Sequence, residues 1–386
     1  MEVIVINNLM LALFLRILGR ILSIFSLFIP KSSKILVFSS FPDYTDNPFA
    51  VYSFMQKCKR YSKYRYIWIY VSRDSVLKDK NNVEAYYKNS LLGLWYFFRA
   101  KYIFCSHGLN SYIRLHQGNK IVNLWHGMPL KVIGSLDEHY KGDNPTKADF
   151  LIATSPLFQE IMSKSFNNID LNRVIIVGQP RNDLLFNETD FFINHNIDVT
   201  KYRKIGIWLP TYRCSILGDK RIDGVYSEDR ISYVSLQDLD RLNDLLKQFD
   251  DLLIVKIHPM DILQLKVFPK YSNIIILKQN DLKEQLYPLL GGCSYLLTDY
   301  SSVWVDYEIL GKPIGFVIEN WKEYSSTRGF TIDNLIDLLP GPILSNYEEL
   351  CNFIIQPPTN FSTKTDIFNI YKDNKSTERL LSYLEL

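Results

Sequence analysis

Short apolar runs alternate with longer amphipathic stretches along most of the chain, beginning near Lys34. The first half holds six such runs, at residues 34–40, 65–71, 101–106, 120–125, 150–155 and 173–178. They are apolar on both faces, which is typical of parallel strands covered by helices on both sides of a sheet. The stretches between them, such as 50–61 and 91–99, are helix-like. The pattern therefore predicts a β-α series built on a parallel sheet.

A second series of the same kind follows a polar interruption at residues 186–203, which are rich in Asn and Asp and lack clear periodicity. Apolar runs return at 204–210, 252–258, 273–278, 295–299 and 313–318. Two β-α series of similar length predict an α/β protein with two Rossmann-like domains that face one cleft. The boundaries that we expect are 31–190 for the first domain, 191–203 for the linker and 204–386 for the second domain.

Residues 1–30 differ from the rest and are expected to form a membrane-interface helix. Residues 9–29 are long enough to span a bilayer, but Arg16 and Arg20 would each cost about 2.5–3.5 kcal/mol at its centre. On a helix, the small and polar residues gather on one side, namely Ala12, Arg16, Gly19, Arg20, Ser23 and Ser26. An amphipathic helix that lies in the interface fits this pattern. A spanning helix and a helix docked on the protein itself are the alternatives.

Composition narrows the class of protein. A chain of 386 residues, nearly half of them hydrophobic, can bury the cores of two domains. The net charge of +3 is too small to indicate a nucleic-acid partner. Five scattered cysteines, without a C-x-x-C pair or metal spacing, fit free thiols in a reducing cytosol. We expect no cofactor and no protein-held metal, and we discount the D-x-D at Asp238 and Asp240 because it lies on a polar predicted helix.

The segment SYLLTDYSSVWVDYEILGKPIGF, residues 294–316, predicts a strand, a tight turn, a helix and a second strand. Asp299 and Ser301 suit a helix N-cap, and the turn would release several backbone N–H groups. Those groups, the helix dipole and the hydroxyls of Ser301 and Ser302 favour a diphosphate. Asp306, one turn further on, could accept hydrogen bonds from ribose hydroxyls. An ordinary capped helix in an α/β domain is the alternative.

Two histidines follow predicted strands, one in each domain. His126 opens the loop after the run 120–125, and His258 ends the run 252–258. An imidazole at such a strand end could take a proton from an attacking hydroxyl near neutral pH. A single histidine of this kind would more often be structural, but these two could meet across the cleft.

Other polar residues also stand at strand ends. Thr211 and Arg213 follow the first strand of the second domain, and a guanidinium suits phosphate oxygens, although a surface arginine is the alternative. Lys256 lies two residues before the second histidine. Arg181 ends the first domain, where an ion pair at the hinge explains it as well as a substrate contact does. His107 has a smaller claim to the acceptor side.

In combination these motifs resemble the CDP-glycerol glycerophosphotransferase family, which includes teichoic acid primases and polymerases and related capsule enzymes. The matching stretches, over about residues 100–345, are NLWHGMPLK, GQPRNDLL, LPTYR, KIHP, LTDYSSVWVDYEILGKPIGF and LLPGP. The resemblance implies a GT-B fold, a peripheral, monotopic attachment to the cytoplasmic face of the cell membrane, and a CDP-activated polyol phosphate as donor.

The resemblance also implies roles for single residues. His126 matches the proposed catalytic base, and His258 matches the histidine that binds the diphosphate and assists the departure of CMP. The donor side is completed by Thr211, Arg213, Lys256, Asp299, Ser301, Ser302 and, more weakly, Asp306 as a ribose contact. The acceptor side is expected to include His107, Lys131 and Arg181.

The implied reaction transfers glycerol phosphate from CDP-glycerol, or ribitol phosphate from CDP-ribitol, to a hydroxyl and releases CMP. The implied acceptor is a lipid-linked one, an undecaprenyl-linked saccharide or polyol phosphate, held at an anionic membrane surface. Catalysis of this kind depends mainly on positioning and on neutralising the phosphoryl oxygens. A GT-B glycosyltransferase with a nucleotide-sugar donor is the main alternative, and a non-catalytic nucleotide-binding scaffold is a weaker one.

Overall fold

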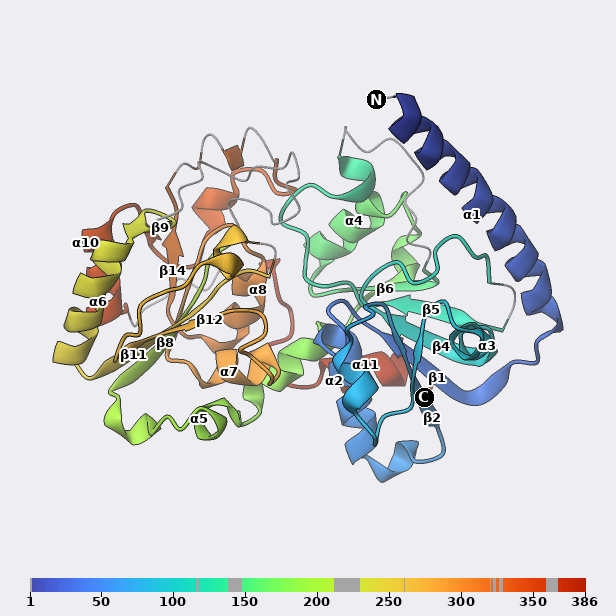
Figure 1. Cartoon of the computed structure of the whole chain (residues 1–386), viewed down its shortest axis with the longest axis horizontal. Helices are drawn as coiled ribbons and strands as arrows, with labels where there is room; N and C mark the ends of the chain where they lie inside the picture. Colours follow the sequence, from blue (N-terminus) through green and yellow to red (C-terminus); the bar gives the residue numbers. More distant parts are fainter. Residues whose placement is uncertain are drawn as a thin grey trace.

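Two parallel β-sheets, each covered by helices, make up the body of the molecule (Figure 1). The structure is a computed structural model of the whole chain. It describes residues 2–115, 118–137, 148–211, 230–259, 261–319, 321, 324–325, 329–358 and 367–386. Arg213 lies outside the described residues.

The first sheet has seven strands in the order β3-β2-β1-β4-β5-β6-β7. In chain order they are β1 (Ser32–Ser39), β2 (Arg65–Tyr70), β3 (Ala85–Tyr87), β4 (Ala100–Cys105), β5 (Lys120–Asn123), β6 (Phe150–Ala153) and β7 (Val174–Ile176). The covering helices are α2 (Asp46–Lys57), α3 (Leu91–Arg99) and α4 (Pro156–Ser165). All six apolar runs predicted in this half are strands. The edge strand β3 was missed because its three residues are only half-buried.

The second sheet has six strands in the order β12-β11-β8-β13-β14-β15. They are β8 (Lys204–Leu209), β11 (Asp251–Lys256), β12 (Ile274–Leu277), β13 (Tyr295–Thr298), β14 (Ile314–Val317) and β15 (Ile343–Leu344). A short hairpin, β9 (Arg230–Ile231) and β10 (Val234–Ser235), precedes α6 (Leu236–Gln248). Asp238 closes a capping box with Ser235 at the start of α6. The remaining helices are α7 (Leu286–Gly292), α8 (Val303–Tyr307) and α10 (Tyr347–Ile355).

The segment between the sheets consists of short helices, and the chain end returns to the first sheet. The 3₁₀ helix at Pro180–Phe186 is followed by α5 (Phe191–Asn194) and a 3₁₀ turn at Val199–Lys201. The last helix, α11 (Ser376–Tyr383), lies beside α2, and the Tyr102 hydroxyl donates to the Leu384 carbonyl at 2.8 Å. The sequence analysis assigned this tail to the second domain. An eight-residue amphipathic pattern does not show which sheet the helix covers.

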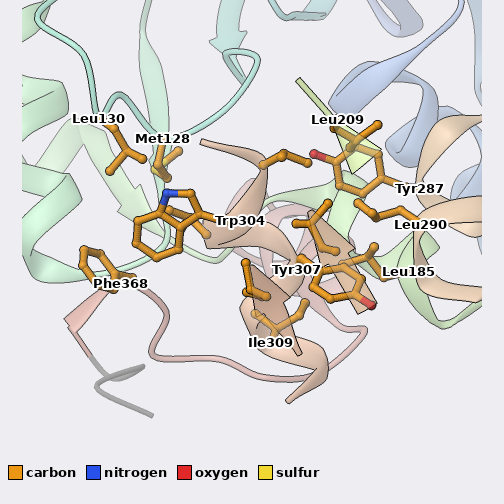
Figure 2. Packing of buried hydrophobic residues seen from close by; sticks show 14 of the residues in the cluster. Met128, Leu130, Leu185, Leu209, Tyr287, Leu290, Trp304, Tyr307, Ile309 and Phe368 are labelled. Carbon is orange, nitrogen blue, oxygen red and sulfur yellow. The ribbon is translucent and has the colours of Figure 1, made fainter. Parts of the chain in front are cut away.

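Apolar packing joins the two domains around α8 (Figure 2). Trp304 is almost completely buried, and its ring lies 5.0 Å from that of Phe368. The same cluster includes Met128 and Leu130 from the loop that follows β5. Burying a large apolar side chain contributes about 1.5–3 kcal/mol. The cluster therefore favours one relative placement of the two sheets.

The second half of helix α1 (Glu2–Phe28) is docked through the small residues of its polar side, whereas Arg16 and Arg20 stay exposed (Figure 1). Gly19, Ser23 and Ser26 are buried, and the Ser23 hydroxyl accepts a hydrogen bond from the Arg114 backbone N–H at 2.8 Å. The opposite side carries exposed apolar residues, among them Phe14, Ile17, Ile21, Ile24, Phe25 and Phe28. This is the reverse of an amphipathic helix docked on a protein core. In the described part of the chain, no helix has the length and apolar character needed to cross a membrane.

Candidate functional site

The residues expected at strand ends lie at the carboxyl edges of the two sheets, either at the point where the strand order reverses or, as with His126 after β5 and His258 after β11, one strand away from it. In the first sheet the strand order reverses between β1 and β4, and in the second between β8 and β13. Ligands of open α/β sheets bind beyond the carboxyl ends of the strands at such points. Ser106 and His107 follow β4, whereas Thr211 and Asp299 stand just beyond β8 and β13. The two switch points are the natural positions for an acceptor side and a donor side.

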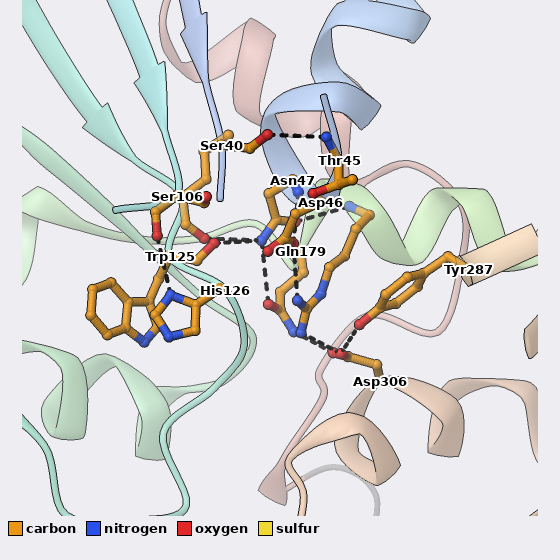
Figure 3. Close-up of polar contacts among 12 residues, drawn as sticks. Ser40, Thr45, Asp46, Asn47, Ser106, Trp125, His126, Gln179, Tyr287 and Asp306 are labelled. Carbon is orange, nitrogen blue, oxygen red and sulfur yellow. Dashed lines mark hydrogen bonds and ion pairs between the residues drawn. The ribbon is translucent and has the colours of Figure 1, made fainter. Parts of the chain in front are cut away.

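His126 is oriented by its neighbours for a role as a base (Figure 3). Its Nδ1 lies 3.1 Å from the carbonyl oxygen of Ser106. A carbonyl can only accept, so Nδ1 carries the hydrogen and Nε2 keeps its lone pair. The ring of Trp125 lies 4.1 Å from the imidazole, and Trp125 adopts φ +50°, an uncommon conformation for a bulky residue. The backbone therefore adopts an unfavourable conformation at the residue directly before His126.

Burial and nearby charges both shift the pKa of His126. Packing of protein around the ring lowers the pKa of His126, and the Arg181 guanidinium lowers it further. The Asp46 carboxylate and the Ser106 carbonyl act in the opposite direction. The residue as a whole is nevertheless exposed to solvent, so that protein atoms crowd the ring without enclosing it. The net lowering of the pKa keeps the ring neutral, in its proton-accepting form, at neutral pH.

The loop that carries His126 touches the serine turn of the other domain. Gly127 has φ +134°, and a Cβ built on it would lie 2.8 Å from Ser302 Oγ and 2.9 Å from Arg181 Nη2. Only glycine fits both this backbone conformation and this approach. Two of the motifs predicted from sequence are therefore in direct contact across the domain boundary.

A pocket of about 350 Å³ lies between the domains beside this contact. It is lined by Thr45, Asp46 and Arg181 of the first domain, by Lys256, His258 and Ser301 of the second, and by apolar residues such as Leu209, Leu286 and Val303. Burial lowers the pKa of Lys256 to about 8. Burial, then the charges of Lys256 and Lys131, lower the pKa of His258 to about 4. At neutral pH Lys256 is therefore the cation of this pair and His258 is neutral, and a buried ammonium beside an N–H donor is well placed to bind an anion.

The serine turn differs in detail from the expectation. The N-cap of α8 is Ser302, whose hydroxyl makes no capping hydrogen bond. Ser301 Oγ accepts from the backbone N–H of Val303 at 3.4 Å. The predicted caps were Asp299 and Ser301. Asp299 is instead buried, and its carboxylate accepts from the N–H and the hydroxyl of Thr211, at 3.0 Å and 2.9 Å. Thr211 and Asp299 thus connect the end of β8 to the end of β13. Because they bond to each other, these hydrogen bonds favour a structural role for the two side chains over direct contact with the donor.

The expectation for Asp306 is wrong. Its side chain is 0% exposed, and its Oδ2 accepts from Arg181 Nη2 at 2.7 Å and from the Tyr287 hydroxyl at 2.5 Å. Its Oδ1 accepts from the Gln179 amide. A carboxylate enclosed in this way has no surface for a ribose hydroxyl. Arg181 therefore forms an ion pair with Asp306 between the domains. The sequence analysis gave such a hinge ion pair as the alternative to a substrate contact.

The acceptor-side candidates are only partly brought together. Both ring nitrogens of His107 are buried and have no hydrogen-bond partner among the described residues. Burial, with the charges of Lys88 and His126, lowers the pKa of His107 to about 4. Lys131 forms an isolated antiparallel bridge with Phe330 of the second domain, and its ammonium lies 5.1 Å from the centre of the Tyr324 ring. The described residues hold no group of three or more His, Cys, Asp or Glu side chains placed to bind a metal.

Sequence reasoning missed the partners of Arg181 in the first domain. Asp46 accepts from Arg181 Nη1 at 2.9 Å, and the Asn47 amide oxygen accepts from the Arg181 backbone N–H at 2.9 Å. Both residues begin α2. A polar pair before an apolar helical stretch reads as a helix start, and nothing local marks a partner 134 residues further on.

Known proteins resemble this chain over most of its length. Residues 21–386 match the family described as CDP-Glycerol:Poly(glycerophosphate) glycerophosphotransferase. A teichoic acid poly(glycerol phosphate) polymerase of Bacillus spizizenii is 27% identical over 93% of this chain and 92% of its own length. A teichoic acid glycerol-phosphate primase of Bacillus subtilis is 28% identical over 72% of this chain and 71% of its own. The poly(glycerol phosphate) polymerase of Staphylococcus epidermidis is 28% identical, and this chain covers 44% of it.

Solved structures share the fold. The wall teichoic acid polymerase TagF superposes with a TM-score of 0.72 at 24% identity, over 92% of this chain and 89% of that chain. A UDP-GlcNAc 2-epimerase of Methanocaldococcus jannaschii gives a TM-score of 0.51 at 14% identity, over 91% of this chain and 99% of that chain. Both likenesses fit two Rossmann-like domains. On the match over residues 21–386, the chain belongs to the CDP-glycerol:poly(glycerophosphate) glycerophosphotransferase family.

Proposed function

We propose that this protein transfers a polyol phosphate, glycerol phosphate in the first instance, from a CDP-activated donor to an acceptor hydroxyl in a GT-B arrangement. The observation that carries the proposal is the contact between the His126 loop and the serine turn at Gly127 and Ser302. It places a neutral imidazole of one domain next to the pocket that Lys256 and His258 of the other domain line. A base opposite a diphosphate site is the arrangement that phosphoryl transfer needs.

In the proposed reaction, His126 Nε2 accepts the proton of the acceptor hydroxyl. The hydroxyl oxygen forms a bond to the β-phosphorus of CDP-glycerol, and the bond from that phosphorus to the oxygen bridging the two phosphates breaks. The electron pair leaves with CMP. Lys256 is a cation at neutral pH and neutralises the phosphoryl oxygens, whereas His258, with a pKa of about 4, offers a neutral N–H donor. The products are the extended acceptor, CMP and a proton held on His126.

Two features support a membrane-bound acceptor. The apolar side of α1 faces away from the protein, so that a bilayer surface would bury it. Arg16 and Arg20 are exposed on the same helix and would attract anionic head groups. An acceptor such as an undecaprenyl-linked saccharide would then meet the cleft from the membrane surface. This part of the proposal places the protein peripherally on the cytoplasmic face of the membrane.

Donor identity is tested by nucleotide release. Purified protein is incubated with a lipid-linked acceptor and, in separate reactions, CDP-glycerol, CDP-ribitol or a UDP-sugar. The proposal expects CMP from a CDP-polyol and no UDP from the sugar donors. Release of UDP would indicate that the protein is a glycosyltransferase with a nucleotide-sugar donor. Donor binding without release of any nucleotide would favour a scaffold.

A further inference from the structure

A buried charge network crosses from one domain to the other directly behind the His126 loop (Figure 3). The Arg181 guanidinium pairs with Asp46 of its own domain at 2.9 Å and with Asp306 of the second domain at 2.7 Å. The side chains of all three are largely or fully buried. Tyr287 and Gln179 donate further hydrogen bonds to Asp306.

The network is connected to the residues that present the base. Asn47 is fully buried, and its side chain links two segments. Its Oδ1 accepts from the Arg181 N–H at 2.9 Å, and its Nδ2 is 3.0 Å from the carbonyl oxygen of Trp125. On the other side, Asp306 is on α8, the helix that follows Ser302. A series of hydrogen bonds, continued through the Arg181 side chain, therefore runs from the donor-side helix to the residue before His126.

Building on the proposed function, we infer that Arg181 is a positioning residue that locks the two domains together with His126 held against the donor turn. It acts through Asp306 on the donor side and through Asn47 on the acceptor side. A buried ion pair between domains is well suited to this role because its charges are stabilised only in the closed arrangement. Misplacement of a reacting group by about 1 Å can cost about 10²-fold in rate.

The chain provides a matched control pair inside the second domain. Arg203 Nη2 and Asp251 Oδ2 are 2.7 Å apart, and Asp251 is almost fully buried. Both residues belong to the amino ends of β8 and β11, away from the carboxyl ends that form the site. Asp251→Asn and Asp306→Asn each remove the charge of a buried carboxylate that pairs with an arginine, although Arg203 is more exposed than Arg181. Both variants should melt at a lower temperature than the unchanged protein.

The first test uses single-turnover CMP release with CDP-glycerol. Asp306→Asn is expected to lose about 10²-fold in rate at saturating donor, with little change in the dissociation constant of the donor. Asp251→Asn is expected to keep both values. A rate for Asp306→Asn equal to that of the control overturns the inference. So does a loss in Asp306→Asn that lies wholly in donor binding, because the network would then hold the donor and not the base.

The second test does not depend on activity and measures the pKa of His126 by NMR of histidine-labelled protein, with His126→Gln for assignment. The groups that face the imidazole are Asp46 on α2, Arg181, and His107 after β4. Loss of the Asp306 charge should release the Arg181 guanidinium, whose charge acts on His126, and so shift the pKa of His126, whereas Asp251→Asn should not. An unchanged pKa in Asp306→Asn overturns the inference. Absence of CMP release by the unchanged protein would instead count against the proposed function, and this second test would still stand.

Discussion

Gly127 and Ser302 belong to different domains, yet they meet so closely that a methyl group at Gly127 would lie 2.8 Å from the Ser302 hydroxyl. This contact joins the loop of the proposed base to the turn of the proposed donor site. Gly127→Ala should therefore push the two apart and lower turnover by about 10²-fold, the scale of a displacement near 1 Å. CMP release with CDP-glycerol measures the effect.

Gly311→Ala is the control for that substitution. Gly311 also has a left-handed backbone, φ +61°, but a Cβ there would have nothing within 4 Å. The change should cost about 1 kcal/mol in stability through backbone strain and leave the rate of CMP release unaltered. Equal activity of the two alanine variants would show that the Gly127 contact is not required.

His126 and His258 should fail in different ways. His126→Gln should bind CDP-glycerol nearly normally and lose about 10²–10⁴-fold in turnover, the usual contribution of positioned proton transfer. A loose transition state needs less from a base, which favours the lower end of that range. Calorimetry for donor affinity, combined with single-turnover kinetics, separates binding from rate. A large loss of donor affinity in His126→Gln would assign that histidine to the diphosphate instead.

His258→Ala should lose donor affinity as well as rate. A hydrogen bond to a charged group contributes about 1.5–3 kcal/mol, which corresponds to about a ten- to hundredfold weaker dissociation constant. The same calorimetric titration measures it. Unchanged affinity for CDP-glycerol would remove His258 from the donor site.

Donor affinity should depend on pH through Lys256. Its pKa is lowered to about 8 by burial, so the ammonium is charged well below pH 8, half-deprotonated at pH 8 and neutral well above it. Because the diphosphate binds the charged form, affinity should be constant well below pH 8 and fall as the pH rises through 8. The phosphates of CDP-glycerol do not titrate in this range. In Lys256→Arg the side chain stays protonated, so the decline should disappear. A decline that persists in Lys256→Arg would assign it to another group.

Membrane attachment should depend on the apolar side of α1. Replacing Phe14 and Phe25, each 60% exposed, with serine should reduce flotation with vesicles that contain phosphatidylglycerol. Ile193→Ser on α5 removes an even more exposed apolar group elsewhere, 77% exposed, and should not change flotation. If the double α1 variant still floats as fully as the control, another surface holds the protein to the lipid.

Every apolar run that the sequence marked as a strand is a strand, because burial on both faces leaves a continuous hydrophobic signature. The strands it missed, such as β3 and β15, are two or three residues long and lie at sheet edges, where that signature is too short to read. The sequence also did not predict that the C-terminal helix α11 packs against the first domain. A helix records that one of its faces is buried, but not against which neighbour.

The candidate site also contains residues that the sequence revealed and residues whose roles depend on distant parts of the chain. His126 and His258 were found because each stands where an apolar run stops, which is a local signal. Asp306 was assigned to a ribose from its place one turn into a helix, but its partner Arg181 lies 125 residues earlier in the chain. Ion pairs between domains leave no periodic pattern in either segment. Trp125 was missed for a related reason, since its left-handed conformation follows from packing and not from residue type.

The most direct measurement of the central claim is the mass of the acceptor after reaction with CDP-glycerol, compared between the unchanged protein and His126→Gln. The account predicts that the acceptor gains the mass of glycerol phosphate, with one CMP released for each unit added, and that both fall together in His126→Gln. An acceptor that gains the mass of a sugar from a nucleotide-sugar donor, or CMP release that is unaffected in His126→Gln, would contradict it.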